Sequence, residues 1–119
     1  MKSEAETAKD RWPVFIRMAR DSFPGGSIRI IDKARENRYW KVGILTRRDR
    51  VDREIFIKVR QNVMTRPEAD YRTYFSQAFQ EAERIFGFPL PSAQFLGTII
   101  VGVDGVHYHE GENLGDDQW

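Results

Sequence analysis

The chain has 119 residues, of which 40% are hydrophobic and 31% are charged, a balance typical of one folded domain. It contains no cysteine, which excludes disulfides, thiolate zinc sites and cysteine nucleophiles. The formal net charge of +1 hides a split: Ile28–Arg60 has eleven basic and five acidic residues, and Gln61–Trp119 has three basic and nine acidic ones. Such an asymmetry bears on the choice of partners rather than on the fold.

The N-terminal segment predicts an amphipathic helix with two alternative starts. Ser3 and Glu6 have the spacing of a capping box, but Pro13 fits poorly inside a helix that begins there. Asp10 offers a second start that leaves Pro13 in the first turn. One helical face then carries Trp12, Phe15, Ile16, Ala19 and Phe23, and Pro24-Gly25-Gly26 predicts its end.

Three strands are predicted next, over Ser27–Lys33, Arg38–Arg47 and Arg53–Val63, with turns at Ala34–Asn37 and Arg48–Asp52. Short turns require antiparallel pairing. Apolar residues alternate along the second and third strands, and these are Trp40, Val42, Ile44, Ile55, Ile57 and Val59. The alternation predicts that one face of the sheet is covered and that the opposite face is open.

A second helix is predicted from an N-cap at Thr65, with Pro67 in the first turn and Glu68 at the capping-box position, to Gly87. Its apolar stripe consists of Tyr71, Phe75, Ala78, Phe79, Ala82, Ile85 and Phe86. Two further strands, Phe95–Val103 and Val106–Glu110, are predicted to form a hairpin around Asp104-Gly105. In that register Val103 pairs with Val106, and Val101 pairs with Tyr108.

These elements predict a single α+β domain over residues 1–119 in the order α-β-β-β-α-β-β. Its sheet has five mostly antiparallel strands, and both helices pack on one face. Residues 1–9 and 111–119 are expected to be flexible ends.

The open face of this sheet is the main functional candidate. Alternation directs cations and aromatic rings away from the helices, as on surfaces where cations contact phosphates and rings stack on bases. The arginine-rich turn between the second and third strands is a second group. The candidate binding residues are Arg29, Lys33, Tyr39, Lys41, Arg47, Arg48, Arg50, Phe56, Lys58 and Arg60. The predicted function is a non-enzymatic module that binds nucleic acid or a nucleic-acid-bound complex.

Two alternatives remain open. The first is a small protein-binding inhibitor or chaperone, such as a phage or mobile-element counter-defence protein, that acts through the acidic C-terminal half, the tail to Trp119 and exposed aromatic residues. The second is a metal-dependent enzyme, since His107 and His109 have the spacing of two metal ligands on one strand face. Glu110 alternates to the other face, and Glu112 would have to fold back. Self-association as a homodimer is compatible with every alternative.

Other catalytic signals are missing from the sequence. It has no GxSxG motif, no P-loop and no GxGxxG motif. Asp49, Asp52 and Glu54 lie among arginines, which favours surface ion pairs over a magnesium site. We therefore expect no cofactor and no enzymatic activity. The charged N-terminus is unlike a signal peptide, and no apolar run reaches the roughly 20 residues of a membrane span, so a cytoplasmic location is expected.

Overall fold

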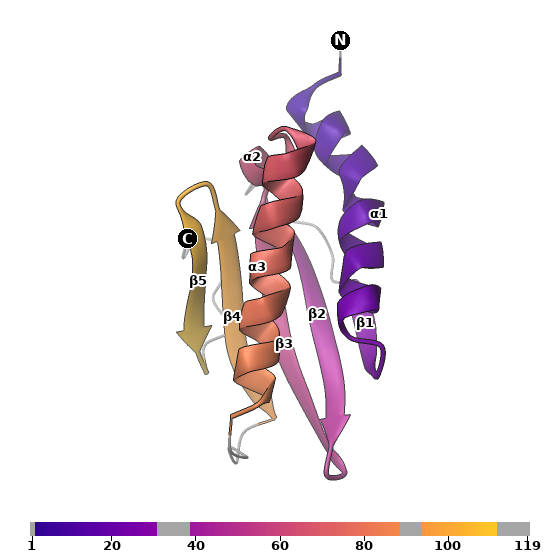
Figure 1. Ribbon diagram of the computed structural model, residues 1–119, viewed down its shortest axis with the longest axis vertical. Coiled ribbons are helices and arrows are strands. Elements are labelled where there is room, and N and C mark those ends of the chain that lie inside the picture. Colours follow the sequence, from indigo (N-terminus) through magenta and orange to yellow (C-terminus); the bar gives the residue numbers. More distant parts are fainter. Residues whose placement is uncertain (1, 31–38, 89–93, 112–119) are drawn as a thin grey trace.

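The computed structural model describes residues 2–30, 39–88 and 94–111. Two long helices, α1 (Glu4–Ser22) and α3 (Glu68–Phe86), lie side by side on one face of a five-stranded sheet (Figure 1). The strands are β1 (Gly26–Ile30), β2 (Tyr39–Arg48), β3 (Val51–Arg60), β4 (Phe95–Gly102) and β5 (Gly105–Glu110). The predicted α+β class is confirmed, and one short helix, α2 (Gln61–Met64), is an addition to the predicted order.

The strands are neighbours in the order in which they occur along the chain. The pairs β1–β2, β2–β3 and β4–β5 are antiparallel, whereas β3 and β4 are parallel. The difference follows from the connections, because the two-residue turns after β2 and after β4 reverse the chain, whereas the long connection through α3 returns it in the same direction. The β2–β3 turn is tighter than predicted: only Asp49 and Arg50 leave the strands, with φ of 52° and 65°.

Helix α1 begins at Glu4 rather than at Asp10 and continues through Pro13. The Ser3 hydroxyl accepts a hydrogen bond from the Glu6 amide at 3.2 Å and donates one to the Glu6 carboxylate at 3.0 Å, so Ser3 caps the helix as predicted. A proline inside a helix costs about 3 kcal/mol. Burial of Trp12 and Phe15 on the opposite side contributes about 2–3 kcal/mol each, which outweighs that cost. The predicted end is confirmed, with Phe23 as the C-cap.

The segment after β3 differs from the prediction. Val63 belongs to α2 and is buried in the core, so the third strand does not extend to it. The Thr65 hydroxyl donates to the Asn62 carbonyl at 3.2 Å and thereby helps to close α2. The N-cap of α3 is Pro67, which makes no side-chain capping bond, so the predicted cap at Thr65 is wrong.

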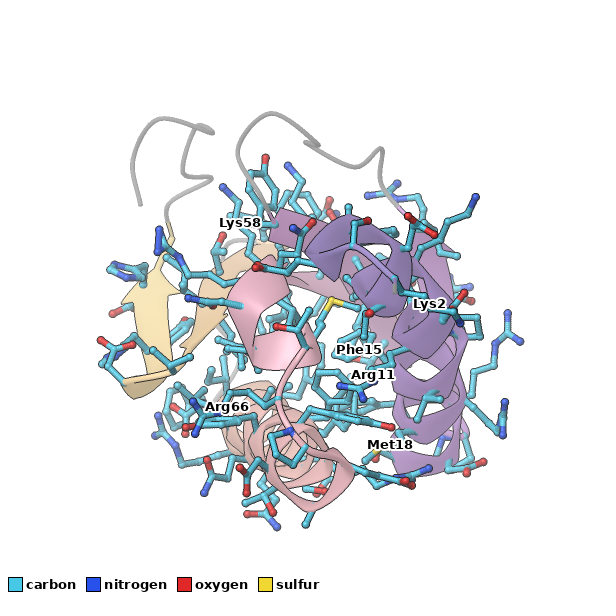
Figure 2. All side chains as sticks on the ribbon, turned by 90° about the horizontal axis from the view of Figure 1, so that it is seen from above. Lys2, Arg11, Phe15, Met18, Lys58 and Arg66 are labelled. Carbon is cyan, nitrogen blue, oxygen red and sulfur yellow. The ribbon has the colours of Figure 1, made fainter. Side chains whose placement is uncertain are left out.

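The hydrophobic core lies between the helices and the sheet. All seven residues of the predicted stripe of α3 are buried, which confirms the helical periodicity. The Phe15 ring contacts Trp12, Phe75 and Phe79 at centroid distances of 4.6, 4.9 and 5.0 Å. Figure 2 shows Phe15 in the interior with Arg11 close by. The Arg11 guanidinium lies 4.6 Å from the Tyr71 ring centroid and so ties α1 to α3.

The β4–β5 hairpin forms with a register two residues away from the predicted one. Gly102 pairs with Gly105 and Ile99 with Tyr108, so the turn residues are Val103 and Asp104. Side chains alternate with a period of two, so this shift leaves each residue on its predicted face. Lys33, the Ala34–Asn37 turn, Arg38 and the tail 112–119 lie outside the described residues.

Candidate nucleic-acid interface on the outer sheet face

We call the sheet surface away from α1 and α3 the outer face. Directly paired residues of antiparallel strands share a face, and Val42–Ile57 and Ile44–Ile55 are core pairs. The intervening pairs therefore belong to the outer face. Seven described candidates lie there, namely Arg29, Tyr39, Lys41, Arg47, Phe56, Lys58 and Arg60. Alternation alone thus assigned the face of each of these residues.

Exposure on the outer face differs from the expectation. Tyr39 is 2% exposed, Phe56 8% and Lys58 1%, so this part of the face is not open. The Lys58 ammonium lies 4.9 Å from the Tyr39 ring centroid, and the Lys41 ammonium lies 5.3 Å from that of Phe56. Figure 2 shows Lys58 on the side of the molecule away from α3. The interpretation that Tyr39 and Phe56 stack on bases is wrong, because buried rings offer no free surface for stacking.

Exposed cations remain on the same face. Arg29, Arg47 and Arg60 are exposed and Lys41 is half-buried. Arg29 forms an ion pair with Glu54, and Arg47 Nε lies 3.6 Å from an oxygen of Asp52. Exposed pairs of this kind are worth only about 0–1 kcal/mol, so a phosphate can compete for these arginines.

The hairpin tip adds further positive charge. Arg50 is exposed at the turn beside Asp49. Arg48 ends β2, and its side chain is not among those described. Unlike the outer-face cations, Arg50 lies in a turn rather than in a strand, so the pleat of the sheet does not fix its direction.

A shallow hollow of about 350 Å³ lies where β3 ends beside the β4–β5 turn. Its polar lining includes Arg60, Asn62, Asp104, His107 and His109. The His107 Nε2 atom lies 3.2 Å from an Asp104 oxygen, which orients the imidazole. The parallel pairing of β3 with β4 brings Arg60 close to the two histidines.

Within residues 2–30, 39–88 and 94–111, no three His, Asp or Glu side chains are arranged to hold a metal ion. His107 and His109 therefore have no third metal ligand among these residues. Glu110 pairs with Gly97, and Glu112 lies outside the described residues. His107 and His109 both line the hollow.

The sequence did not indicate the positions of two polar residues, Asn62 at the hollow and Arg53 on the helix side of the sheet. Asn62 was assigned to a strand, but the α2 turn brings it to the hollow. Arg53 was predicted only as the first residue of the third strand; it pairs with Thr46, points to the helix side and is 1% exposed. The sequence does contain the relevant pattern. Ile55 and Ile57 face the core, and residues two apart in a strand share a face, so Arg53 is expected on the helix side too.

Comparison of the chain with protein-family models, curated proteins and solved structures finds no match. Within the part of the chain that the structure describes, no helix is both long and apolar enough to cross a membrane.

Proposed function

We propose that the chain is a non-enzymatic binding module that holds nucleic acid by phosphate contacts on its outer face. The observation that carries the proposal is the presence of Arg29, Lys41, Arg47 and Arg60 on one face of three adjacent strands. Cations in such an array replace the counterions of a phosphate backbone. Arginine also matches phosphate with a planar pair of donors.

The hollow beside the β4–β5 turn supports the same proposal. It adds the Asn62 amide and the imidazoles of His107 and His109 to the Arg60 guanidinium. All of these groups can donate hydrogen bonds to phosphate oxygens. Because Tyr39 and Phe56 are buried, the contacts are expected to involve the backbone of the nucleic acid and to show little sequence preference.

The test is fluorescence anisotropy with labelled single-stranded DNA, duplex DNA and RNA over a series of salt concentrations. The outer-face variant is Lys41→Gln/Arg47→Gln/Arg60→Gln. Lys58 is left unchanged because it is buried, and its replacement would disturb the fold. The matched control is Lys9→Gln/Arg17→Gln/Arg20→Gln, which removes one lysine and two arginines from exposed positions of α1.

We expect the outer-face variant to bind duplex DNA more weakly and to reduce the slope of log affinity against log salt by up to about 3. The control variant should keep most of the wild-type affinity and slope. Equal losses in both variants would show that only net charge matters and would refute the outer face as the interface. Absence of wild-type binding at low salt would reject nucleic acid and favour a protein partner.

A further inference from the structure

Polar side chains from three elements meet in the hollow beside the β4–β5 turn. Arg60 comes from the end of β3, Asn62 from α2, and the imidazoles of His107 and His109 from β5. Together they line a space of about 350 Å³. A concave place with several convergent polar groups is the usual form of a ligand site.

Some of these groups have hydrogen-bonding capacity left for a ligand. Among the residues that the structure describes, neither the Asn62 amide nor the His109 imidazole makes a side-chain hydrogen bond. Asn62 is exposed and His109 is half-buried, so both are accessible. The contact of His107 with Asp104 uses Nε2 at 3.2 Å and leaves Nδ1 on the other side of the ring. A ligand with several acceptor atoms fits this set of groups.

The charges around the hollow favour an anion. The described charged residues that line it are Arg60 and Asp104, and Asp104 contacts His107. Lys58 lies on the same face, in register with Ile100 of the lining. A bound anion favours the protonated form of a neighbouring imidazole, in which both ring nitrogens donate. Cationic groups then outnumber the carboxylate of Asp104.

The hollow lies at one end of the outer face. Arg60 is the last residue of β3, and Val103 and Asp104 of the β4–β5 turn border the hollow. Helix α2 and this turn lie at the same end of the molecule (Figure 1). A strand held along the outer face therefore reaches its end here. A terminal phosphate monoester carries up to about two negative charges and three acceptor oxygens, more than an internal phosphodiester.

We propose that this hollow binds the terminal phosphate monoester of a nucleic-acid strand that lies on the outer face. This assignment rests on the proposed function and adds the class of strand, one that ends in a phosphate group. Arg60 supplies planar donors to the phosphate, and Asn62 and the imidazoles bond its remaining oxygens. The other outer-face cations contact internal phosphates.

The first experiment measures fluorescence anisotropy with one single-stranded DNA sequence that carries its fluorophore on an internal base. Its three versions end in a 5′-phosphate, in a 3′-phosphate, or in hydroxyl groups at both ends. We expect a terminal phosphate at one or both ends to tighten binding about tenfold, the effect of one charge-assisted hydrogen bond. Equal affinity of all three versions would overturn the proposed end recognition and leave the outer-face interface standing.

Variants test whether the hollow is the place of this recognition. In Asn62→Ala/His107→Ala/His109→Ala, the three versions of the DNA should bind alike. The matched control, Lys41→Gln/Arg47→Gln, lies outside the hollow and should weaken all versions by a similar factor, so that the preference remains. If a melting curve shows that the triple variant does not fold, Asn62→Ala at its exposed position should reduce the preference on its own. A preference that persists in the folded hollow variant would refute the hollow as the site.

The second experiment needs no nucleic acid. Inorganic phosphate is titrated into the full chain and backbone amide shifts are followed by ¹H–¹⁵N NMR, with sodium chloride at matched ionic strength as the control. We expect saturable shifts with phosphate alone at Gly102, Val103, His107 and His109, and the absence of such shifts would overturn the phosphate site. Absence of DNA binding at low salt would reject the proposed function, and the nucleic-acid terminus with it, even where phosphate itself binds.

Discussion

The substitution Gly97→Ala tests the closest backbone approach in the β4–β5 hairpin. Gly97 has φ of +147°, a conformation that residues with a side chain rarely adopt. A Cβ atom at this position would lie 2.4 Å from the His109 carbonyl oxygen and 2.6 Å from Cε1 of Tyr108. Because the nearer atom belongs to the backbone of the paired strand, rotation of a side chain cannot relieve the clash.

The expected loss has two parts. The unfavourable backbone conformation costs about 1–3 kcal/mol. Forcing a methyl group into a packed contact costs about another 1–3 kcal/mol. We therefore expect Gly97→Ala to lower the free energy of unfolding by about 4 kcal/mol, a large share of the roughly 5–15 kcal/mol typical of a domain.

Two other glycines separate these parts. Gly105 has φ of +128°, but a Cβ atom added there would have no heavy atom within 4 Å, so Gly105→Ala should show only the conformational cost of about 1–3 kcal/mol. Gly25 has open space and no positive φ, so Gly25→Ala should be neutral or stabilise by up to about 1 kcal/mol.

The assay is urea unfolding followed by the fluorescence of the buried Trp12 and Trp40. The reasoning predicts the order Gly97→Ala, Gly105→Ala, Gly25→Ala, from the largest loss to the smallest. If Gly97→Ala and Gly105→Ala were equally stable within error, the close contact with His109 would contribute nothing and the reasoning would be refuted.

Three further predictions concern the core, a helix cap and pH. Phe15→Ala should lower the free energy of unfolding by about 3–5 kcal/mol, because the ring is fully buried among aromatic rings; a loss below about 1 kcal/mol in urea unfolding would contradict this packing. Ser3→Ala removes the bond from the Glu6 amide and should cost about 1 kcal/mol, whereas an unchanged urea midpoint would show that the cap is not formed in solution. Tyr108 donates to the Leu96 carbonyl at 2.5 Å, so Tyr108→Phe should cost about 1 kcal/mol at about pH 8. Burial, followed by the charge of Glu110, raises the pKa of Tyr108 above its unfolded value, so this stabilisation is complete below about pH 10 and is lost as the pH rises through the folded-state pKa. The wild type should therefore lose more stability than the phenylalanine variant in urea unfolding at alkaline pH, and parallel pH profiles would contradict this assignment.

Local periodicity predicted the elements that depend on it. The stripe on α3 is buried as predicted, and Trp40, Val42 and Ile44 face the helices. These assignments follow from the 3.6-residue and two-residue repeats of the backbone, which need no knowledge of distant contacts. The same repeat gave the face of each outer-face cation.

Boundaries were less predictable where two local structures compete for the same residues. Thr65 and Glu68 have capping-box spacing, yet the Thr65 hydroxyl bonds to Asn62 and closes α2. Pro13 suggested a late helix start, yet packing of Trp12 and Phe15 outweighs the lost backbone bond. In both cases several local signals were present, and the energetics of the surrounding structure determined which one prevailed.

The amino-acid pattern was sufficient to predict the fold class, the core-facing residues and the face on which each strand cation lies. Three features emerged only when the helices and strands were assembled: Tyr39 and Lys58 are buried, Arg60 lies near His107 and His109, and Arg53 is enclosed with two of its nitrogens unpaired. The physical reason is that alternation fixes the direction of a side chain, whereas its burial and its neighbours depend on segments far away in the chain.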